Sequence, residues 1–358
     1  MKSEQAQPID SSTLEKIKPI ELPPLPENPL VSVLIANYNY AQYIGEAIEG
    51  VLNQTYQNFE IIVCDDGSTD NSLEVIERYA KLDKRVKYVA KENGGVASAL
   101  NTAFAHSSGS VICLLDSDDK WFPHRLSRVV SKLLISKQSG LVVHPLRVVD
   151  HLGKTVLWQV PTFLKDGWFG QQIFDGYSPV LAPASGITLR REIAQRVFPL
   201  PETFRTGADR ILLECAMLFT NVCSIKEPLG IYRVHGKNLT GVEGPTSSES
   251  LDRAIEKVRV VLDYRKQFIQ NTLGLIPNYD ISLAPAMVEL ICAKRLLIGE
   301  RCHSENEKLI SLLHDPKKRI AWRALFLLPT SLATRVLKIW WSSGFFKRLL
   351  QFILGHVQ

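Results

Sequence analysis

Between residues 30 and 116, four short apolar runs alternate with segments of helical character. The runs are LVSVLIA at 30–36, FEIIVC at 59–64, VKYVA at 86–90 and SVICLLD at 110–116. The first run is β-branched and aliphatic, which is typical of a strand buried on both faces. The segment at 44–55 carries apolar residues at helical spacing, and Asp70 or Asn71 can cap the next helix. This β-α-β-α-β-α-β order predicts an α/β domain with a mostly parallel sheet and helices on both faces.

Polar residues follow each of the four predicted strands, at the point where the strand ends. They are NYN at 37–39, then Asp65 and Asp66, then Asn93-Gly94-Gly95, and finally the DSDD sequence at 116–119. Sheets of this class bind ligands beyond the carboxyl ends of their strands. The four clusters therefore predict one ligand site at that edge of the sheet.

The DSDD sequence indicates a divalent cation. The chain has neither a GxGxxG nor a GxxxxGK[ST] sequence, so neither a dinucleotide-binding Rossmann fold nor a P-loop is supported. A diphosphate can instead be held by Mg²⁺ or Mn²⁺, which take carboxylate and phosphate oxygens. Asp116 and Asp118 are two residues apart and point the same way on a continuing strand. The alternative is that these carboxylates only cap the next helix.

Four stretches resemble glycosyltransferase family 2, whose members are inverting transferases of GT-A fold. They are SVLIANYN, QTYQNFEIIVCDDGSTDNS, ENGGVASALNTAFAHSSGSVICLLDSDDKWFP and EPLGIYRVHGKN, and they occur in the family's order between about residues 30 and 240. The resemblance implies a GT-A catalytic domain at 30–240, with a donor- and metal-binding half at 30–123 and an acceptor-binding half at 124–240. It also implies a nucleotide-diphosphate sugar donor in UDP, GDP or dTDP form, and Mn²⁺ or Mg²⁺.

The resemblance also implies roles for individual donor-side residues. Asp116-Ser117-Asp118 stands as the DxD motif, and Asp118 and Asp119 are the preferred metal ligands. Asp66 is expected to accept from an N–H of the nucleotide base, and Asp65 to support it or to touch the ribose. The other donor-side positions are the aromatic Tyr38, the backbone of Asn93, Gly94 and Gly95, and Ala36, where relatives often carry Thr or Ser.

Inverting transfer needs a carboxylate that takes the proton of the attacking hydroxyl. By the resemblance, Gly207-Ala208-Asp209 stands where the family has an ED-like motif, so Asp209 is the expected base. The alternative is that Asp209 only caps the helix that follows. Ser185 and Gly186 are expected near the reacting groups on the acceptor side. In YRVHGKN, Arg233 is a possible diphosphate clamp and His235 a possible further metal ligand, or an ordinary hydrogen-bonded histidine.

The ends of the chain differ in character from its centre. Residues 1–29 lack the apolar region of a signal peptide and contain several prolines, which predicts an extended arm. Residues 241–358 predict a helical region that ends in a basic, aromatic-rich tail. Residues 317–354 include Trp322 and are expected to contact a membrane surface. The alternatives are a helical subdomain packed on the catalytic core, or a dimer interface.

The sequence therefore predicts a metal-dependent inverting glycosyltransferase for a glycan or lipid-linked acceptor, active in polysaccharide or cell-envelope glycan assembly. We expect it in the cytoplasm, peripheral on the inner face of the membrane, because the six cysteines include no CxxC pair. No nucleic-acid partner is expected. Two alternatives stay open: a non-catalytic nucleotide-sugar-binding scaffold, and a nucleotidyltransferase that makes sugar nucleotides. The sequence names neither the base, the sugar nor the acceptor.

Overall fold

The computed structural model describes residues 17–179, 182–235, 247–277, 279–313 and 315–342, with side chains as far as Leu337. Two compact units are present. The first contains Ile17–Gln171 and Pro179–Leu239, and the second contains Gln172–Ser178 and the helices after residue 247. Each unit is described by itself below.

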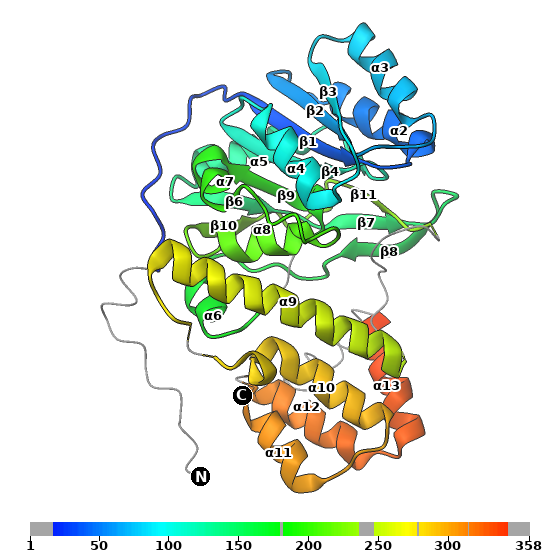
Figure 1. Ribbon diagram of the computed structural model, residues 1–358, viewed down its shortest axis with the longest axis vertical. Coiled ribbons are helices and arrows are strands. Elements are labelled where there is room, and N and C mark those ends of the chain that lie inside the picture. Colours follow the sequence, from blue (N-terminus) through cyan, green and yellow to red (C-terminus); the bar gives the residue numbers. More distant parts are fainter. Residues whose placement is uncertain (1–16, 180–181, 236–246, 278, 314, 343–358) are drawn as a thin grey trace. The chain divides into compact units, whose positions relative to one another are not determined.

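The first unit is built on a seven-stranded sheet whose strand order is β10-β6-β9-β4-β1-β2-β3 (Figure 1). Only β9 among these strands is antiparallel to its neighbours β4 and β6, so the predicted mostly parallel sheet is confirmed. The strands are β1 (Val31–Asn37), β2 (Phe59–Asp65), β3 (Val86–Ala90), β4 (Val111–Asp116), β6 (Ser139–Val143), β9 (Ile187–Arg190) and β10 (Asn221–Ser224).

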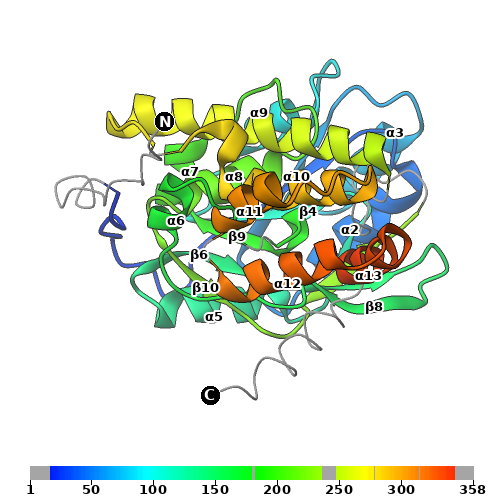
Figure 2. The same ribbon diagram turned by 90° about the horizontal axis from the view of Figure 1, so that it is seen from below.

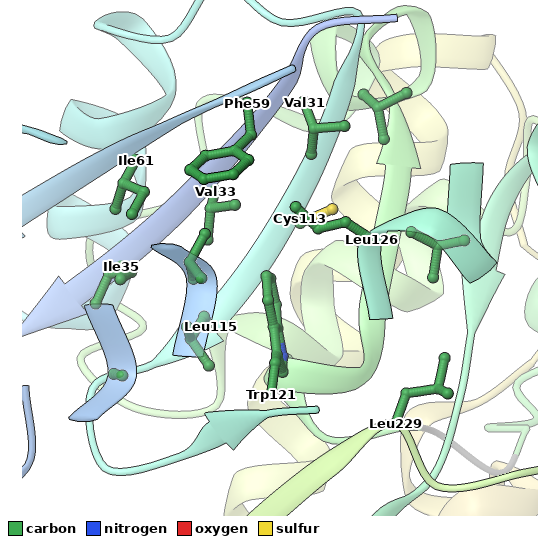
Figure 3. Close-up of a cluster of buried hydrophobic side chains, with 14 of the residues drawn as sticks. Val31, Val33, Ile35, Phe59, Ile61, Cys113, Leu115, Trp121, Leu126 and Leu229 are labelled. Atoms are coloured by element: carbon green, nitrogen blue, oxygen red, sulfur yellow. The ribbon is translucent and has the colours of Figure 1, made fainter. Parts of the chain in front are cut away.

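Strands β1, β2 and β4 are almost wholly buried because helices cover the sheet on both faces, whereas β3 at the sheet edge is largely exposed. Val33 and Ile35 of β1 point into the core shown in Figure 3, together with Ile61 and Leu115 of the neighbouring strands. The helices of this unit are α2 (Ala41–Leu52), α3 (Ser72–Leu82), α4 (Val96–Ala105), α5 (Arg125–Ile135), α6 (Gly170–Phe174), which runs into the second unit, α7 (Arg191–Val197) and α8 (Ala208–Ala216). Side chains of α2, α3 and α5 enter this core.

A second, four-stranded sheet has the order β5-β11-β7-β8. Its strands are β5 (Lys120–Trp121), β7 (Leu146–Val149), β8 (Thr155–Val160) and β11 (Gly230–Arg233). β5 pairs with β11, with Lys120 opposite Ile231. This pairing brings the chain just after DSDD beside the YRVHG sequence, although more than a hundred residues separate the two.

Residues 18–29 form an extended arm along the first unit. Ile17 is buried, the Tyr56 hydroxyl donates to Pro29 O at 2.6 Å, and Ile20 N donates to Phe219 O at 2.8 Å. The extended conformation agrees with the proline-rich sequence. Residues 1–16 of the predicted arm lie outside the described residues.

The second unit is helical, as Figures 1 and 2 show. Its elements are α9 (Ser248–Leu273), η2 (Ile281–Leu283), α10 (Pro285–Leu297), α11 (His303–Ser311), α12 (Pro316–Leu327) and α13 (Thr330–Ser342). Trp322, which the sequence analysis grouped with membrane-facing aromatics, is only 1% exposed and packs in a core with Leu296 and Leu325. The membrane interpretation is wrong for this residue, because its indole is buried in the hydrophobic core of the helical unit. In the part of the chain that the structure describes, every helix is too short or too polar to cross a membrane.

Glu60 carries a buried charge in β2. Its carboxylate accepts from Ser32 Oγ at 2.7 Å, Ser108 N at 2.6 Å and Lys87 Nζ at 2.8 Å. Burial raises the pKa of Glu60, but these hydrogen bonds outweigh it and lower the pKa to about 2. The carboxylate thus links β1, β2, β3 and the turn before β4.

We predict that Glu60→Gln destabilises the fold at pH 7 by roughly 2 kcal/mol, the usual value of charged hydrogen bonds. The difference from the unsubstituted chain should shrink as the pH falls from about 4.5 toward 2, because the unfolded carboxyl takes up its proton first. Urea unfolding between pH 7 and pH 3 measures it, with exposed Glu74→Gln as control. A difference that does not change with pH would contradict this assignment.

Candidate active site

Three aspartates crowd the carboxyl end of β4. Asp116 is the last residue of the strand, Asp118 and Asp119 follow it, and one ligand oxygen from each lies within 4.8 Å of the others. Burial raises the pKa of Asp116 well above its ordinary value, and the charges of Asp119, Asp118 and Asp209 raise it further. Asp119 is affected in the same way, by burial first and then by Asp118. The cluster is an arrangement that a cation stabilises.

The Ser185 hydroxyl forms hydrogen bonds with two members of this cluster. It lies in η1 (Ala184–Gly186), where its hydroxyl donates to Asp119 Oδ2 at 2.6 Å and accepts from Asp116 N at 3.0 Å. The other oxygen of Asp119 accepts from Arg233 N at 3.1 Å. Gly186 is required in this turn, since a Cβ there would lie 2.3 Å from His144 O. The sequence placed Ser185 on the acceptor side, and the structure shows that its hydroxyl supports the DxD sequence.

The YRVHG sequence meets the aspartates from β11. His235 Nε2 lies 3.0 Å from Asp118 Oδ2, and its ring stacks on Tyr43 at a centroid distance of 4.8 Å. Arg233 Nε donates to Asp118 O at 3.1 Å, and its Nη2 donates to Glu46 at 3.0 Å. The structure thus brings His235 and Arg233 to the cluster.

The first turns of α2 contribute residues that the sequence analysis missed. Besides Tyr43 and Glu46, the ring of Tyr40 lies edge-on to His235 at 5.5 Å. Burial raises the pKa of Tyr40, and the charges of Asp118 and Asp116 raise it further. The sequence NYNYAQY could have indicated these residues. It links the first strand to the helix that follows, so the start of that helix lies near the carboxyl ends of the strands.

The residues present fit a hard divalent cation. All three side chains offer carboxylate oxygens, which Mg²⁺ and Mn²⁺ prefer. Among the described residues none donates a hydrogen bond to the Asp116 carboxylate, so both of its oxygens are available. The Asp119 oxygens are already oriented by Ser185 and Arg233. His235 contacts this set through Asp118.

The carboxyl end of β2 is organised by Asp65 and Asp66. Asp66 accepts from Lys91 Nζ at 3.0 Å, from Gly94 N at 2.9 Å and from Gly95 N at 2.7 Å. Asp65 accepts from Asn37 Nδ2 at 2.8 Å and from the hydroxyl and N–H of Ser68. Both carboxylates therefore shape the turns that border the site.

The remaining donor-side positions also lie at this edge. Ala36 of β1 pairs in register with Cys64 on one side and with Asp116 on the other. Tyr38 is exposed and follows directly after β1, whereas Ser117 is buried. The Asn93 side chain accepts from the guanidinium of Arg205, so the glycine turn contacts the second half of the unit.

Asp209 lies in the first turn of α8. Gly207, with φ +71°, occupies the N-cap position, and Asp209 is the second residue of the helix. Burial raises the pKa of Asp209, and its charge in turn contributes to the raised pKa of Asp116. The two carboxylates are therefore within electrostatic reach, although they come from different halves of the unit.

The segment before α8 is fastened to α4. Asn101 Nδ2 donates to Leu200 O at 2.8 Å, and Leu200 N donates to Asn101 Oδ1 at 2.7 Å. Val96 N donates to Arg205 O at 3.2 Å, next to Gly95, where a Cβ would lie 2.7 Å from Arg205 Cα. These contacts fix α8, and with it Asp209, relative to the glycine turn.

Comparisons with known proteins agree with this geometry. The model for glycosyl transferase family 2 matches residues 32–198. An uncharacterized glycosyltransferase of Nostoc sp. is 34% identical over 258 residues, which are 70% of this chain and 79% of that protein. The chondroitin synthase of Pasteurella multocida is 39% identical over 141 residues, which are 39% of this chain and 15% of the synthase. A solved structure of S. aureus TarS in complex with UDP-GlcNAc has a TM-score of 0.50 at 16% identity, covering 82% of this chain and 87% of that chain.

The sheet, its helices and the aspartate cluster define a GT-A type α/β enzyme, and the structural likeness to TarS supports that fold. The chain belongs to glycosyl transferase family 2, as the Nostoc relative and the family model show. It is a glycosyltransferase, and the predicted family is confirmed.

We predict that Asp118→Ala abolishes any stabilisation by Mn²⁺ and a nucleoside diphosphate, because it removes one of three clustered carboxylates. Ligand-induced stabilisation follows the binding constant, so thermal unfolding with and without Mn²⁺ and UDP, GDP or dTDP measures it. Asp150→Asn, whose carboxylate caps the β7–β8 turn, is the control. An equal Mn²⁺-dependent shift in Asp118→Ala would rule out the metal assignment.

Proposed function

We propose that this protein is a metal-dependent, inverting glycosyltransferase. It moves a sugar from a nucleotide-diphosphate donor to a hydroxyl of a glycan or lipid-linked acceptor. The observation that carries the proposal is the pairing of a three-carboxylate cluster at the end of β4 with a separate, partly buried carboxylate, Asp209, whose charge raises the pKa of Asp116. In this proposal the three clustered aspartates bind the cation that holds the donor diphosphate. Asp209 takes the proton of the attacking hydroxyl.

Asp209 is suited to act as a general base. Its pKa is raised by burial, so its carboxylate binds a proton more readily than an exposed one does. Its place at the start of α8, outside the metal cluster, lets it take the acceptor proton on the side opposite the leaving group. A bound Mn²⁺ or Mg²⁺ supplies charge neutralisation for the departing diphosphate. Asp116, Asp118 and Asp119 would hold that ion, with His235 contacting Asp118.

The donor lies, in this proposal, along the edge from β1 to β4. The exposed ring of Tyr38 is available to stack on a base. Asp66 and Lys91 present an acceptor beside a donor, which matches adjacent N–H and C=O groups on uracil, thymine or guanine. Further contacts come from the remaining donor-side residues: Ala36, Asp65, Asn93, Gly94, Gly95, Asp116, Ser117 and Arg233.

The acceptor is proposed to be a glycan or a lipid-linked glycan. The similarity to a chondroitin synthase, 39% identical over 141 residues, supports polysaccharide or cell-envelope glycan assembly. A thermal-shift screen of UDP-, GDP- and dTDP-sugars with Mn²⁺ identifies the donor, with ADP- and CDP-sugars expected to give no shift. The transfer reaction is then followed as release of the nucleoside diphosphate.

Asp209→Asn should lower release of the nucleoside diphosphate by at least roughly 100-fold, the usual size of a lost general base. Donor affinity should stay within a few-fold, because Asp209 is outside the metal cluster. Glu202→Gln, an exposed neighbour that accepts from Ser98, is the control. Unchanged turnover would remove Asp209 as base, and lost donor binding would reassign it to the donor site.

We further propose that α12 contacts the inner face of the cytoplasmic membrane. Ile320 and Leu327 are seven residues apart, so they lie on one side of α12, and Leu327 is 83% exposed. Lys317 on α12 and Arg335 on α13 are also exposed and can meet anionic phosphates. All six cysteines are described and none forms a disulfide, which supports a cytoplasmic setting. Residues 343–354 of the predicted membrane-contacting tail lie outside the described residues.

Replacing Ile320 and Leu327 together by Glu should reduce co-sedimentation with phosphatidylglycerol vesicles at least about 5-fold, because the variant lacks the two exposed aliphatic side chains that insert into the lipid. Leu82→Glu is the matched control, since Leu82 is 76% exposed but belongs to the first unit. Equal sedimentation of both variants, or equal binding to neutral phosphatidylcholine vesicles, would contradict the proposal.

A further inference from the structure

A completely buried arginine lies behind the aspartate cluster. Arg125 begins α5, is 0% exposed, and its guanidinium stacks on the ring of Trp121 at 3.8 Å. Burial lowers the pKa of Arg125, but an arginine remains charged in proteins. Among the described residues no carboxylate pairs with it, and its Nη1 has no hydrogen-bond partner. Such a charge is costly to bury, so its contacts need an explanation.

The guanidinium is bonded to the strand that follows Ser185. Arg125 Nη2 donates to Ile187 O at 3.1 Å and to Thr188 Oγ1 at 2.8 Å. Both acceptors belong to the start of β9, directly after the turn that contains Ser185. One side of that turn is therefore fixed by Arg125.

His144 fixes the same turn through a second contact. Arg125 Nε donates to His144 Nε2 at 3.2 Å, and His144 Nδ1 donates to Pro145 O at 2.9 Å. Burial and the Arg125 charge lower the pKa of His144 to about 3, so the ring stays neutral and can accept this bond. The backbone N–H of His144 donates to Gly186 O at 3.0 Å, next to Ser185.

Trp121 connects the arginine to Ser185 itself. Its indole Nε1 donates to Ser185 O at 2.9 Å, and its ring is packed in the core with Cys113, Leu115 and Leu126 (Figure 3). The ring is thus held by the guanidinium on one face and by its hydrogen bond at the edge. Arg125, His144 and Trp121 together surround the Ser185 turn.

We propose that Arg125 is a positioning residue for the metal site: it fixes the Ser185 turn, and Ser185 in turn orients Asp119 and the backbone of Asp116. This inference rests on the proposed metal-dependent donor site and adds a residue that has no contact with the ligand. Arg125 acts by geometry, because its side-chain hydrogen bonds among the described residues go to His144, Ile187 and Thr188 and not to the aspartates. Partners of this kind commonly change metal affinity 10- to 100-fold.

The first test compares Arg125→Met with Arg265→Met. Arg265 is also 0% exposed and also lies over a ring, that of Tyr279 at 5.3 Å, but it belongs to the helical unit. Binding of Mn²⁺, alone and with UDP, GDP or dTDP, is measured from the electron paramagnetic resonance signal of the free ion. Arg125→Met should weaken Mn²⁺ binding at least about 10-fold, and Arg265→Met should leave it unchanged. Equal Mn²⁺ affinity in both variants would overturn the inference.

Two further variants keep the test valid if Arg125→Met folds poorly. Trp121→Phe removes the bond to Ser185 O while keeping an aromatic ring beside the guanidinium, and should weaken Mn²⁺ binding by about 3- to 10-fold. Arg125→Met and Ser185→Ala should be non-additive, so the double variant loses no more than the stronger single one. Additive losses, or a Trp121→Phe protein that binds Mn²⁺ normally, would show that Arg125 only stabilises the fold.

Measurements on the unsubstituted chain distinguish failure of the proposed metal-dependent donor site from failure of the proposed role of Arg125. If it binds no Mn²⁺ with any of the three nucleotides, the metal-dependent donor site is refuted, and the inference about Arg125 with it. If it binds Mn²⁺ and Arg125→Met binds it equally well, only the inference about Arg125 is refuted. Weaker binding in Arg125→Met with an unchanged unfolding temperature would be the clearest support.

Discussion

The mutual repulsion of three carboxylates clustered at the end of β4 is the constraint on which the rest of the site depends. Asp116, Asp118 and Asp119 have raised pKa values, chiefly because burial disfavours their charged forms. The two oxygens of Asp119 are oriented by uncharged donors, the Ser185 hydroxyl and the Arg233 N–H. Such donors fix the oxygens while leaving the negative charge in place, and that charge is what attracts a cation.

The two halves of the first unit are joined by hydrogen bonds between α4 and the segment before α8. Asn101 and Leu200 exchange two bonds, and Gly95 packs directly against the Arg205 backbone. Asp66 fixes the glycine turn from β2. Asp209 is consequently held at a defined place relative to the aspartate cluster. The proposed inverting transfer requires this, since a base and the leaving group must act on opposite sides of one carbon.

Local pattern was sufficient for the sheet but not for every contact at the site. The four apolar runs form strands β1 to β4, and the polar residues that follow them lie at the carboxyl ends of these strands. The sequence offered Asp70 or Asn71 as the cap of α3: Asn71 holds the position, but the side chain of Asp70 makes the bond to Ser72 N. Trp322 was misjudged, because aromatic composition does not reveal which way a helix turns.

The sequence by itself determined the fold class, the position of the clustered aspartates and the choice of Asp209 as the candidate base. These follow from strand periodicity, from the order of polar turns and from family motifs. Only the tertiary structure decided which residues position the aspartates. Ser185 donates a hydrogen bond to Asp119, and the buried Arg125 stacks on Trp121, which donates to Ser185 O. These contacts join residues about sixty positions apart, and their geometry depends on how β9 packs beside β4, which no local pattern encodes.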